Sequence, residues 1–297
     1  MNLFDCTTAN MKAKLYSVAH LETAKKLFPS KANQEDWLDF IWTDAEINAC
    51  KLYEMEAFIN APSLSTYPHS GLLDPQSSVP EELRIVDRYL SSLTMPAASF
   101  LSVGCGLGEK ELRLARTHPN VSFVAVDNAP HVECLNKLAS ELGLRNIIFR
   151  NCDLKTLAPE KYDVVYSFSV IYCISDRALP CYFNLLINNL GDNGVAFVGD
   201  TSNYNLILKC QLFVLRCIRI IMKRNTGLKQ TGWLRDLREI YRFIPNSATI
   251  GHVFQLDHLI RSRFLNKTGL GQILRFFSEK CFPISNSSYM FVLRKAL

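Results

Sequence analysis

The chain has 297 residues, of which 48% are hydrophobic and 21% are charged, a composition that supplies a sizeable core and excludes an intrinsically disordered protein. Its net charge of +5 hides an asymmetry: residues 1–204 carry 17 Lys/Arg against 24 Asp/Glu, a net −7, whereas residues 205–297 carry 16 against 4, a net +12. The basic carboxyl-terminal third fits either a solvated surface or attraction to an anionic substrate, carrier, nucleic acid or membrane.

The amino terminus and the cysteines favour a cytoplasmic protein. The first residues, Met1 to Cys6, show no basic stretch followed by an apolar run, so we expect no secretory signal peptide. The ten cysteines are scattered, without a CxxC pair or a Cys/His cluster at zinc spacing. We therefore expect neither a disulfide framework nor a metal site, and we predict packing roles for the cysteines in a reducing compartment.

Residues 1–80 are predicted to form a helical cap and a linker. Apolar residues recur at three- and four-residue spacing over Asn10–Leu27 and Gln34–Ile59, as in amphipathic helices. Residues 61–80 are rich in proline and are predicted to form a loop. Pro80 and the acids after it then start a helix to about Leu93, because proline and acidic side chains suit a first helical turn.

From residue 98 onward, short apolar strands alternate with helices, which is typical of a parallel sheet covered on both faces. The predicted strands are Ser99–Val103, Ser122–Val126, Ile147–Arg150, Val164–Phe168 and Val195–Val198. The predicted helices are Glu109–Thr117, His131–Leu142 and Ala178–Asn189.

The segment after the fifth strand breaks this rhythm. We expect a helical insertion over about 201–262, then two closing strands at Gly271–Phe277 and Ser288–Arg294. The predicted fold is therefore a mostly parallel, seven-stranded α/β sheet with helices on both faces. It has a helical cap at 1–80 and one domain at 81–297 that contains the insertion.

A glycine-rich loop, Gly104-Cys105-Gly106-Leu107-Gly108, joins the first strand to a helix. Glycines permit a tight turn and close approach of ligand atoms, and the helix amino terminus offers unpaired N–H donors. This placement is typical of a nucleotide-binding loop, although a turn that binds nothing is the alternative. Dinucleotide-dependent dehydrogenases carry GxGxxG, whereas the spacing here is GxGxG, so we favour a dehydrogenase less.

Two acids follow the next two predicted strands. Asp127 ends the second strand, and Asp153 comes directly after the third. Because the carboxyl ends of parallel strands meet at one edge, where open α/β sheets bind ligands, we expect both acids beside the glycine loop. A carboxylate at the position of Asp127 can accept hydrogen bonds from both ribose hydroxyls. Each acid alone fits an ordinary solvated loop, but loop and acids in this order favour a nucleotide site.

On these residues the chain resembles the class I S-adenosylmethionine-dependent methyltransferases, which have a Rossmann-like fold. The likeness covers residues 82–200 well and 265–297 loosely. The segment Leu101–Gly108 is similar to the family's first motif, and Tyr162–Tyr172 is similar to its fourth-strand segment. Leu190–Gly194 is similar to the turn before its fifth strand. The resemblance implies methyl transfer from S-adenosylmethionine.

The resemblance also implies roles for individual residues. The loop would pass the methionine part of the cofactor, Asp127 would hold the ribose, and Asp153 would meet the adenine amino group. One departure stands at Ser102, because many members carry there an acid that holds the cofactor's amino group; Glu109 or a residue of the cap is a candidate substitute. The implied cofactor-binding residues are Gly104, Cys105, Gly106, Asp127, Asn128, Cys152, Asp153, Leu154, Ser167 and Phe168.

Candidates for a catalytic residue are few, because an activated methyl needs mainly alignment with its acceptor. His69 in the proline-rich linker is a candidate base, with a surface-loop histidine as the alternative. Tyr172 follows the fourth strand, where acceptor pockets of the family commonly begin, and His252 lies in the insertion. Ordinary packing is the alternative for both.

The favoured acceptor is a small molecule methylated on oxygen, nitrogen or carbon. The family's Asn/Asp-Pro-Pro-aromatic signature for amino groups is absent after the fourth strand, where Ser167–Val170 stands, so we expect no nucleic-acid substrate. A membrane-associated or carrier-bound acceptor is the second possibility. A binding protein of the same fold without catalysis is the third.

The insertion contains a basic helix at Leu206–Arg224. Four cations interrupt its apolar run, which argues against a bilayer span. Two interpretations stay open: a lid whose apolar face covers the acceptor, which we favour, and a helix lying on a membrane surface. Farther on, Arg235, Arg238 and Arg242 are spaced to form one cationic helical face for a carboxylate or phosphate.

Overall fold

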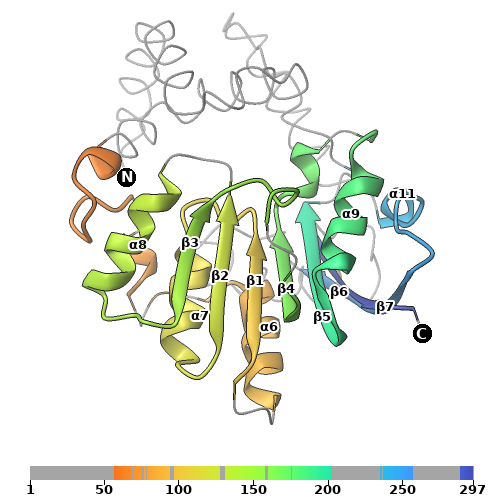
Figure 1. The fold of residues 1–297 in the computed structure, drawn as a ribbon, viewed down its shortest axis with the longest axis horizontal. Coiled ribbons are helices and arrows are strands. Elements are labelled where there is room, and N and C mark those ends of the chain that lie inside the picture. The colour runs from red at the N-terminus through yellow and green to blue at the C-terminus, as the bar shows by residue number, and fades with distance from the viewer. Residues whose placement is uncertain are drawn as a thin grey trace, which may run out of the picture.

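A computed structural model describes residues 57–68, 70–74, 77, 79–93, 97–127, 131–157, 160–174, 176–201, 235, 237–256 and 288–296. The described residues build a seven-stranded sheet in the order β3-β2-β1-β4-β5-β7-β6 (Figure 1). Strands β1 to β5 are mutually parallel, and β7 runs antiparallel to both of its neighbours. The predicted Rossmann-like, mostly parallel fold is confirmed.

The strands are β1 Ser99–Val103, β2 Ser122–Asp127, β3 Ile147–Asn151, β4 Tyr162–Phe168, β5 Leu190–Thr201, β6 Ala248–Leu256 and β7 Ser288–Lys295. The α-helices are α6 Glu81–Ser92, α7 Glu109–Thr117, α8 Val132–Glu141, α9 Leu179–Asn188 and α11 Leu237–Tyr241. Two short 3-10 helices are η1 Ser70–Leu72 and η2 Ile171–Cys173.

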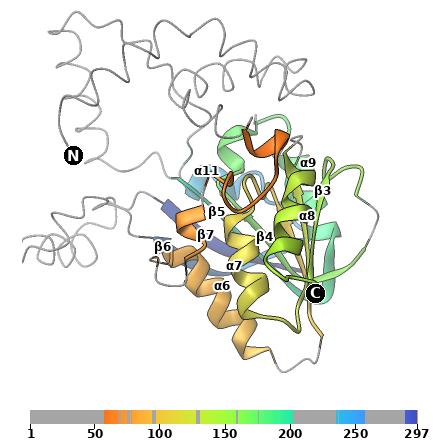
Figure 2. The ribbon, with the colours of Figure 1, turned by 90° about the vertical axis from the view of Figure 1, so that its left-hand side faces the viewer.

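Helices cover both faces of the sheet, as the strand pattern predicted (Figure 2). On one face, α6, α7 and α8 pack their apolar sides against Phe100, Phe123 and other buried strand residues. On the other face, α9 and α11 pack against Leu101, Phe291 and their neighbours. Because β1, β2 and β4 are enclosed on both faces, most residues in the middle of these strands are apolar.

The strand order reverses between β1 and β4, so the helices that follow these two strands diverge to opposite faces. The carboxyl ends of β1, β2, β3 and β4 therefore lie along one edge, drawn uppermost in Figure 1. This reversal is the topological switch point at which open α/β sheets bind their ligands. The loops after these strands define the candidate site.

The predicted helical insertion at 201–262 is wrong at its carboxyl end, because residues 248–256 form strand β6. Ile250, Val253 and Phe254 have helical spacing, but the register shifts between Ile250 and His252. This bulge adds a residue, so Ile250 and Val253 pack on one face although they are three positions apart. The predicted strand Gly271–Phe277, the basic helix Leu206–Arg224 and the cap helices before residue 57 lie outside the described residues.

The described part of the predicted linker packs along the domain. The Tyr67 side chain is buried against Phe58, and its hydroxyl donates a hydrogen bond to the Leu107 carbonyl oxygen at 2.7 Å. From α7, Arg113 donates to Ser77, and Arg116 donates to the carbonyl oxygen of Leu73. Residues that precede the α/β domain are thereby held beside the glycine loop.

Candidate active site

The glycine loop lies between β1 and α7 and is held at its base by the neighbouring strand. The N–H groups of Gly104 and Cys105 donate to the Val126 carbonyl oxygen at 2.8 and 3.1 Å. Gly104, Gly106 and Gly108 have φ angles of 75°, 54° and 71°. Residues with a Cβ rarely adopt such angles, which explains the three glycines.

Among the described residues, the middle of this loop has open space beside it. At Gly106, no heavy atom of the described residues, apart from chain neighbours, lies within 4 Å of the position of an added Cβ. At Gly104 the same position is 2.3 Å from a methyl carbon of Val170, and at Gly108 it is 2.7 Å from the Phe149 ring. The loop is therefore packed tightly at both ends and leaves room for a ligand at its centre.

Asp127 and His131 fix the backbone of Gly106 from two sides. The Gly106 N–H donates to Asp127 Oδ2 at 2.8 Å. The Nε2 atom of buried His131 donates to the Gly106 carbonyl oxygen at 2.9 Å. The structure thus brings Asp127 to the loop, as predicted. His131 was expected only as the start of a helix, and the sequence offers no clear signal for its contact with the loop.

The end of β3 lies beside Asp127. The Cys152 N–H donates to the Asp127 carbonyl oxygen at 3.1 Å. Asp153 is exposed, and its Oδ1 atom accepts a hydrogen bond from the Lys155 N–H at 2.9 Å. Leu154 is buried, and Cys152 is half-buried. Loop, Asp127 and Asp153 therefore lie along one edge, while Asn128 lies outside the described residues.

The two cysteines at this edge are neutral lining groups. Burial raises the pKa of the Cys105 thiol well above its ordinary value, and Glu111 and Asp127 add to this rise. Burial also raises the pKa of Cys152, with Arg150 acting in the opposite direction. Since thiolates rather than thiols are nucleophilic, neither cysteine is suited to covalent catalysis.

The end of β4 contributes Phe168 to the site and turns Ser167 away from it. Ser167 is fully buried, and its hydroxyl hydrogen-bonds the hydroxyl of Tyr182 on α9. Phe168 stacks beside Tyr166, and the Lys110 ammonium nitrogen lies 4.3 Å from the Phe168 ring centroid. Lys110 also pairs with Glu82 of α6 at 3.3 Å. Because its hydroxyl bonds Tyr182, the Ser167 side chain belongs to the core and does not face the site.

A buried carboxyl group lies behind the loop, next to Ser102. The Ser102 hydroxyl donates to Glu111 Oε1 at 2.6 Å. The other oxygen, Oε2, is buried and has no hydrogen-bond partner among the described residues. Burial raises the pKa of Glu111 to about 7, and the hydrogen bond from Ser102 acts against this rise. The serine in place of the family's acid is thus accompanied by a carboxyl group from the following helix.

The sequence contained a signal for Glu111. On α7 it lies on the buried side with Leu112, Leu114 and Ala115. An acid on the apolar side of an amphipathic helix costs free energy unless it has a partner or a function. Helical phase would therefore have favoured Glu111 over Glu109 as the substitute acid.

The loop after β4 is held from two directions. The Tyr172 N–H donates to Oδ2 of buried Asp200, at the end of β5, at 2.6 Å. Arg235 donates to the carbonyl oxygens of Ile171 and Ile174 at 3.0 and 2.7 Å, and it forms an ion pair with Asp176. These contacts fix η2, and with it the backbone of Tyr172, beside the switch point.

The prediction of one cationic face formed by Arg235, Arg238 and Arg242 is wrong. Arg235 is 6% exposed and precedes α11, which has only five residues. Its guanidinium donates hydrogen bonds to one carboxylate and two carbonyl groups. Arg238 and Arg242 are exposed. The spacing did not reveal that Arg235 is buried by hydrogen bonds to acceptors in the loop after β4.

His252 is not brought to the site. It lies on β6, four strands from β1 in the sheet order, which corresponds to about 19 Å at the usual strand spacing. Its ring is exposed and packs edge-on against Phe254, with centroids 4.4 Å apart. His69 lies outside the described residues. Tyr172 is thus the one candidate catalytic residue that the described part of the chain places near the switch point.

Comparison with known proteins identifies the fold family. Residues 95–240 match a family model described as "Methyltransferase domain". Mitomycin 7-O-methyltransferase has a TM-score of 0.52 at 13% identity, covering 96% of this chain and 67% of that one. Coclaurine N-methyltransferase, solved with N-methylheliamine and SAH, has a TM-score of 0.51 at 13% identity, covering 72% and 70%. Residues 95–240 therefore match a methyltransferase domain, and the two solved methyltransferases share the fold of this chain.

The curated relatives add little about function. An uncharacterized protein of Rickettsia prowazekii is 29% identical over 104 residues, which are 34% of this chain and 19% of that protein. The chain spans between 19% and 50% of the length of the curated relatives it matches.

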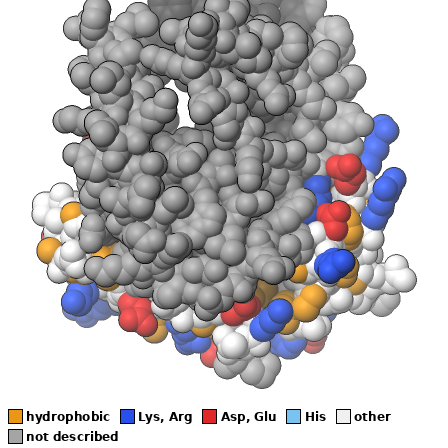
Figure 3. Space-filling model, turned by 90° about the horizontal axis from the view of Figure 1, so that it is seen from above, with side chains coloured by type: hydrophobic (Ala, Val, Ile, Leu, Met, Phe, Trp, Pro, Cys, Tyr) orange, Lys and Arg blue, Asp and Glu red, His pale blue; other side chains and the backbone are white. Residues whose placement is uncertain are grey.

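The described residues contain neither a helix that could span a membrane nor a cluster of metal ligands. No described helix combines the length and the apolar character that crossing a bilayer requires. Within the same residues, no three His, Cys, Asp or Glu side chains gather as metal ligands. The described surface visible from above carries acidic and basic side chains interspersed (Figure 3).

Proposed function

We propose that this protein transfers the methyl group of S-adenosylmethionine to a small-molecule acceptor. The observation that carries the proposal is the edge formed by the glycine loop, Asp127 and Asp153, with open space at Gly106 among the described residues. The two structural neighbours above act, by their names, on mitomycin and coclaurine, which are both small molecules. The match of residues 95–240 to a methyltransferase domain supports the same chemistry.

The residues at the edge match the parts of the cofactor. A carboxylate accepts about four hydrogen bonds, which suffice for the Gly106 N–H and two ribose hydroxyls at Asp127. In this proposal Asp153 meets the adenine amino group, with Cys152 and Leu154 beside the ring. Phe168 and the loop border the methionine part. Asn128, Ser167, Gly104 and Cys105 complete the proposed set, and Ser167 contributes only through its backbone because its hydroxyl bonds Tyr182.

We assign the cofactor's ammonium group to the pair formed by Ser102 and Glu111. A buried carboxyl with one unpartnered oxygen is costly alone, and a nearby ammonium group reduces that cost by pairing with its ionised form. The hydroxyl of Ser102 orients the carboxyl by donating to Oε1. In this proposal, the Glu111 carboxylate of α7 binds the ammonium group that many family members bind with an acid at the position of Ser102.

The protein's part in catalysis is alignment and exclusion of water. Bound S-adenosylmethionine supplies a methyl group already activated by its sulfonium leaving group. Holding an acceptor in line with it contributes on the order of 7–11 kcal/mol to lowering the barrier. Asp200 and Arg235 serve this purpose by fixing η2, next to which the acceptor is expected. A general base is required only for an acceptor that loses a proton.

Replacing Asp127 by alanine is expected to weaken binding of S-adenosylhomocysteine at least tenfold. The variant loses the acceptor for the ribose hydroxyls and the contact that orients the Gly106 N–H. Isothermal titration calorimetry of the purified full-length chain measures this directly, with micromolar affinity expected for the unchanged protein. Asp192→Ala is the control, because the Asp192 side chain is fully exposed and pairs only with Lys295 among the described residues. Equal affinities of all three proteins would rule out the assigned ribose contact.

Transfer itself is tested with tritiated S-adenosylmethionine and a small-molecule extract of cells. Label should appear in an extracted small molecule with the unchanged protein and not with Asp127→Ala. Binding without any transfer would favour the non-catalytic alternative.

A second candidate is an acceptor on a membrane or a carrier, favoured by the net +12 charge of residues 205–297. Co-sedimentation with anionic vesicles, lost in high salt, would support this candidate. A cytoplasmic location is the working expectation for both.

A further inference from the structure

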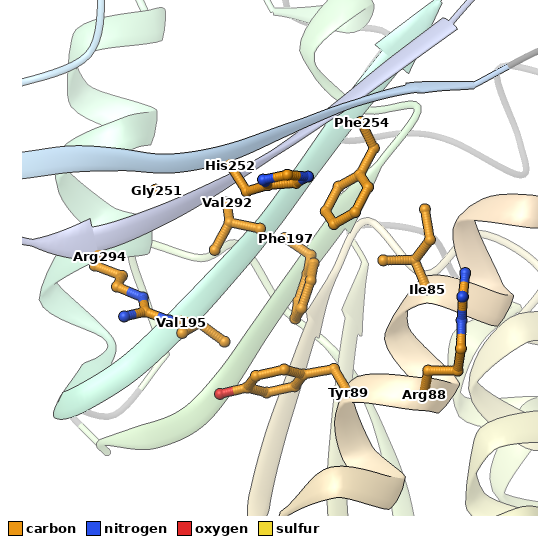
Figure 4. Close-up of a pocket in the computed structure, with 10 residues that line it drawn as sticks. All are labelled: Ile85, Arg88, Tyr89, Val195, Phe197, Gly251, His252, Phe254, Val292 and Arg294. Carbon is orange, nitrogen blue, oxygen red and sulfur yellow. The ribbon is translucent and has the colours of Figure 1, made fainter.

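A cavity of about 450 Å³ lies on the sheet face beside α6, away from the glycine loop (Figure 4). Its floor consists of Val195 and Phe197 of β5 and Val292 of β7, all less than a tenth exposed. Ile85 of α6 and Phe254 of β6 form the side walls (Figure 4). Volumes of this order are typical of small-molecule sites with apolar linings.

Two arginines flank this apolar floor. Arg88 of α6 and Arg294 of β7 lie at opposite ends of the cavity in Figure 4. Neither guanidinium forms an ion pair with a carboxylate of the described residues, and Arg88 only donates from Nε to the Arg84 carbonyl oxygen at 3.3 Å. The Tyr89 hydroxyl group points toward the end of the cavity where Arg294 lies (Figure 4). Burial raises the pKa of Tyr89, and nearby Arg294 opposes this rise.

The cavity is separate from the proposed cofactor site. Val195 pairs with Val164 in the first half of β4, whereas the cofactor edge lies at Phe168, which pairs with Gly199. Four residues of strand correspond to about 13 Å. The cavity also opens on the face covered by α6, beside the antiparallel strands β7 and β6.

We propose that this cavity is an accessory site for a small amphipathic carboxylate with an aromatic or short alkyl body. The aromatic and branched floor suits the apolar body by hydrophobic burial. The guanidinium group at either end suits the carboxylate, since arginine and carboxylate form paired, charge-assisted hydrogen bonds. The site stands independently of the proposed methyl transfer, because none of its residues belongs to the cofactor edge.

The test uses 2-naphthoate and its neutral analogue 2-naphthamide, titrated into the full-length protein and followed by calorimetry. The unchanged protein is expected to bind 2-naphthoate at least tenfold more tightly than 2-naphthamide. The double variant Arg88→Gln/Arg294→Gln should bind the two compounds equally. Both arginines are exposed, so the fold is retained in this variant. Arg238→Gln/Arg242→Gln, which removes the same charge from the other side of the sheet, should behave like the unchanged protein.

Three results would overturn the proposal. The first is no saturable binding of 2-naphthoate at millimolar concentration. The second is competition by saturating S-adenosylhomocysteine, which would place the probe in the cofactor site. The third is a dimer in sedimentation that Arg88→Gln/Arg294→Gln dissociates, which would make this face an interface between two copies. Failure of the methyl-transfer assay leaves the binding test unaffected.

Discussion

Replacing Glu111 by glutamine should stabilise the folded protein by about 3 kcal/mol at pH 8 and change its stability little at pH 5. Burial raises the pKa of Glu111 from 4.5 to about 7. The folded state therefore holds the proton more tightly than the unfolded state. The stability that this group contributes is fully present below pH 4.5 and is lost as the pH rises through about 7. Glutamine does not titrate, so the variant lacks this loss.

Denaturant titrations of both proteins at pH 5 and pH 8 measure this difference. Ser102→Ala is the matched control, because it removes the hydrogen bond that lowers the Glu111 pKa. Its loss of stability should begin at the same pH and extend to higher pH. Equal pH dependence of the unchanged protein and Glu111→Gln would show that Glu111 is ionised in the folded state throughout this range.

The same variant separates a structural role of Glu111 from its assigned role at the cofactor's ammonium. Pairing with an ammonium stabilises the ionised carboxylate, so affinity for S-adenosylhomocysteine should rise between about pH 6 and pH 8. Glu111→Gln should show lower affinity at pH 8 and no such rise. A stabilised variant with unchanged affinity would confine Glu111 to a structural role.

Gly104→Ala should destabilise the fold by about 2–4 kcal/mol. The alanine must adopt the positive φ angle of 75°, and its Cβ would lie 2.3 Å from a methyl carbon of Val170. Val170 is branched at Cβ and comes two residues after the end of β4, so it has little freedom to move away. Thermal or denaturant unfolding measures the loss.

Gly143→Ala isolates the backbone part of this cost. Gly143 has a φ of 72°, and no heavy atom of the described residues lies within 4 Å of its added Cβ. Its variant should lose only about 1–2 kcal/mol, the cost of the left-handed conformation. If Gly104→Ala loses no more free energy of unfolding than Gly143→Ala, the result would contradict the tight packing at Val170.

Elements with a strong local pattern were predictable from the sequence. Strand Ser99–Val103 and helix Glu109–Thr117 have the predicted bounds, because apolar runs, glycines and acids mark their ends. Asp127 reaches the loop because it ends a strand next to β1, a consequence of parallel topology. The candidate cofactor edge followed from the same reasoning.

Features that depend on tertiary contacts were not predictable. The bulge in β6 gave its apolar residues helical spacing, and only pairing with β7 makes this segment a strand. Ser167 was expected among the cofactor-binding residues, but its hydroxyl bonds Tyr182 of α9 in the core. Arg235 belongs by spacing to a cationic face, yet the loop after β4 binds it. Each outcome depends on a partner distant in the sequence.

A crystal structure of the protein with S-adenosylhomocysteine tests the assignment of the cofactor edge most directly. We predict both ribose hydroxyls within about 2.6–3.2 Å of the Asp127 carboxylate oxygens. The methionine part should cross the loop at Gly106, and the adenine should lie between Cys152 and Leu154. The ligand bound at another part of the molecule, with the Gly106–Asp127 edge empty, would contradict the assignment.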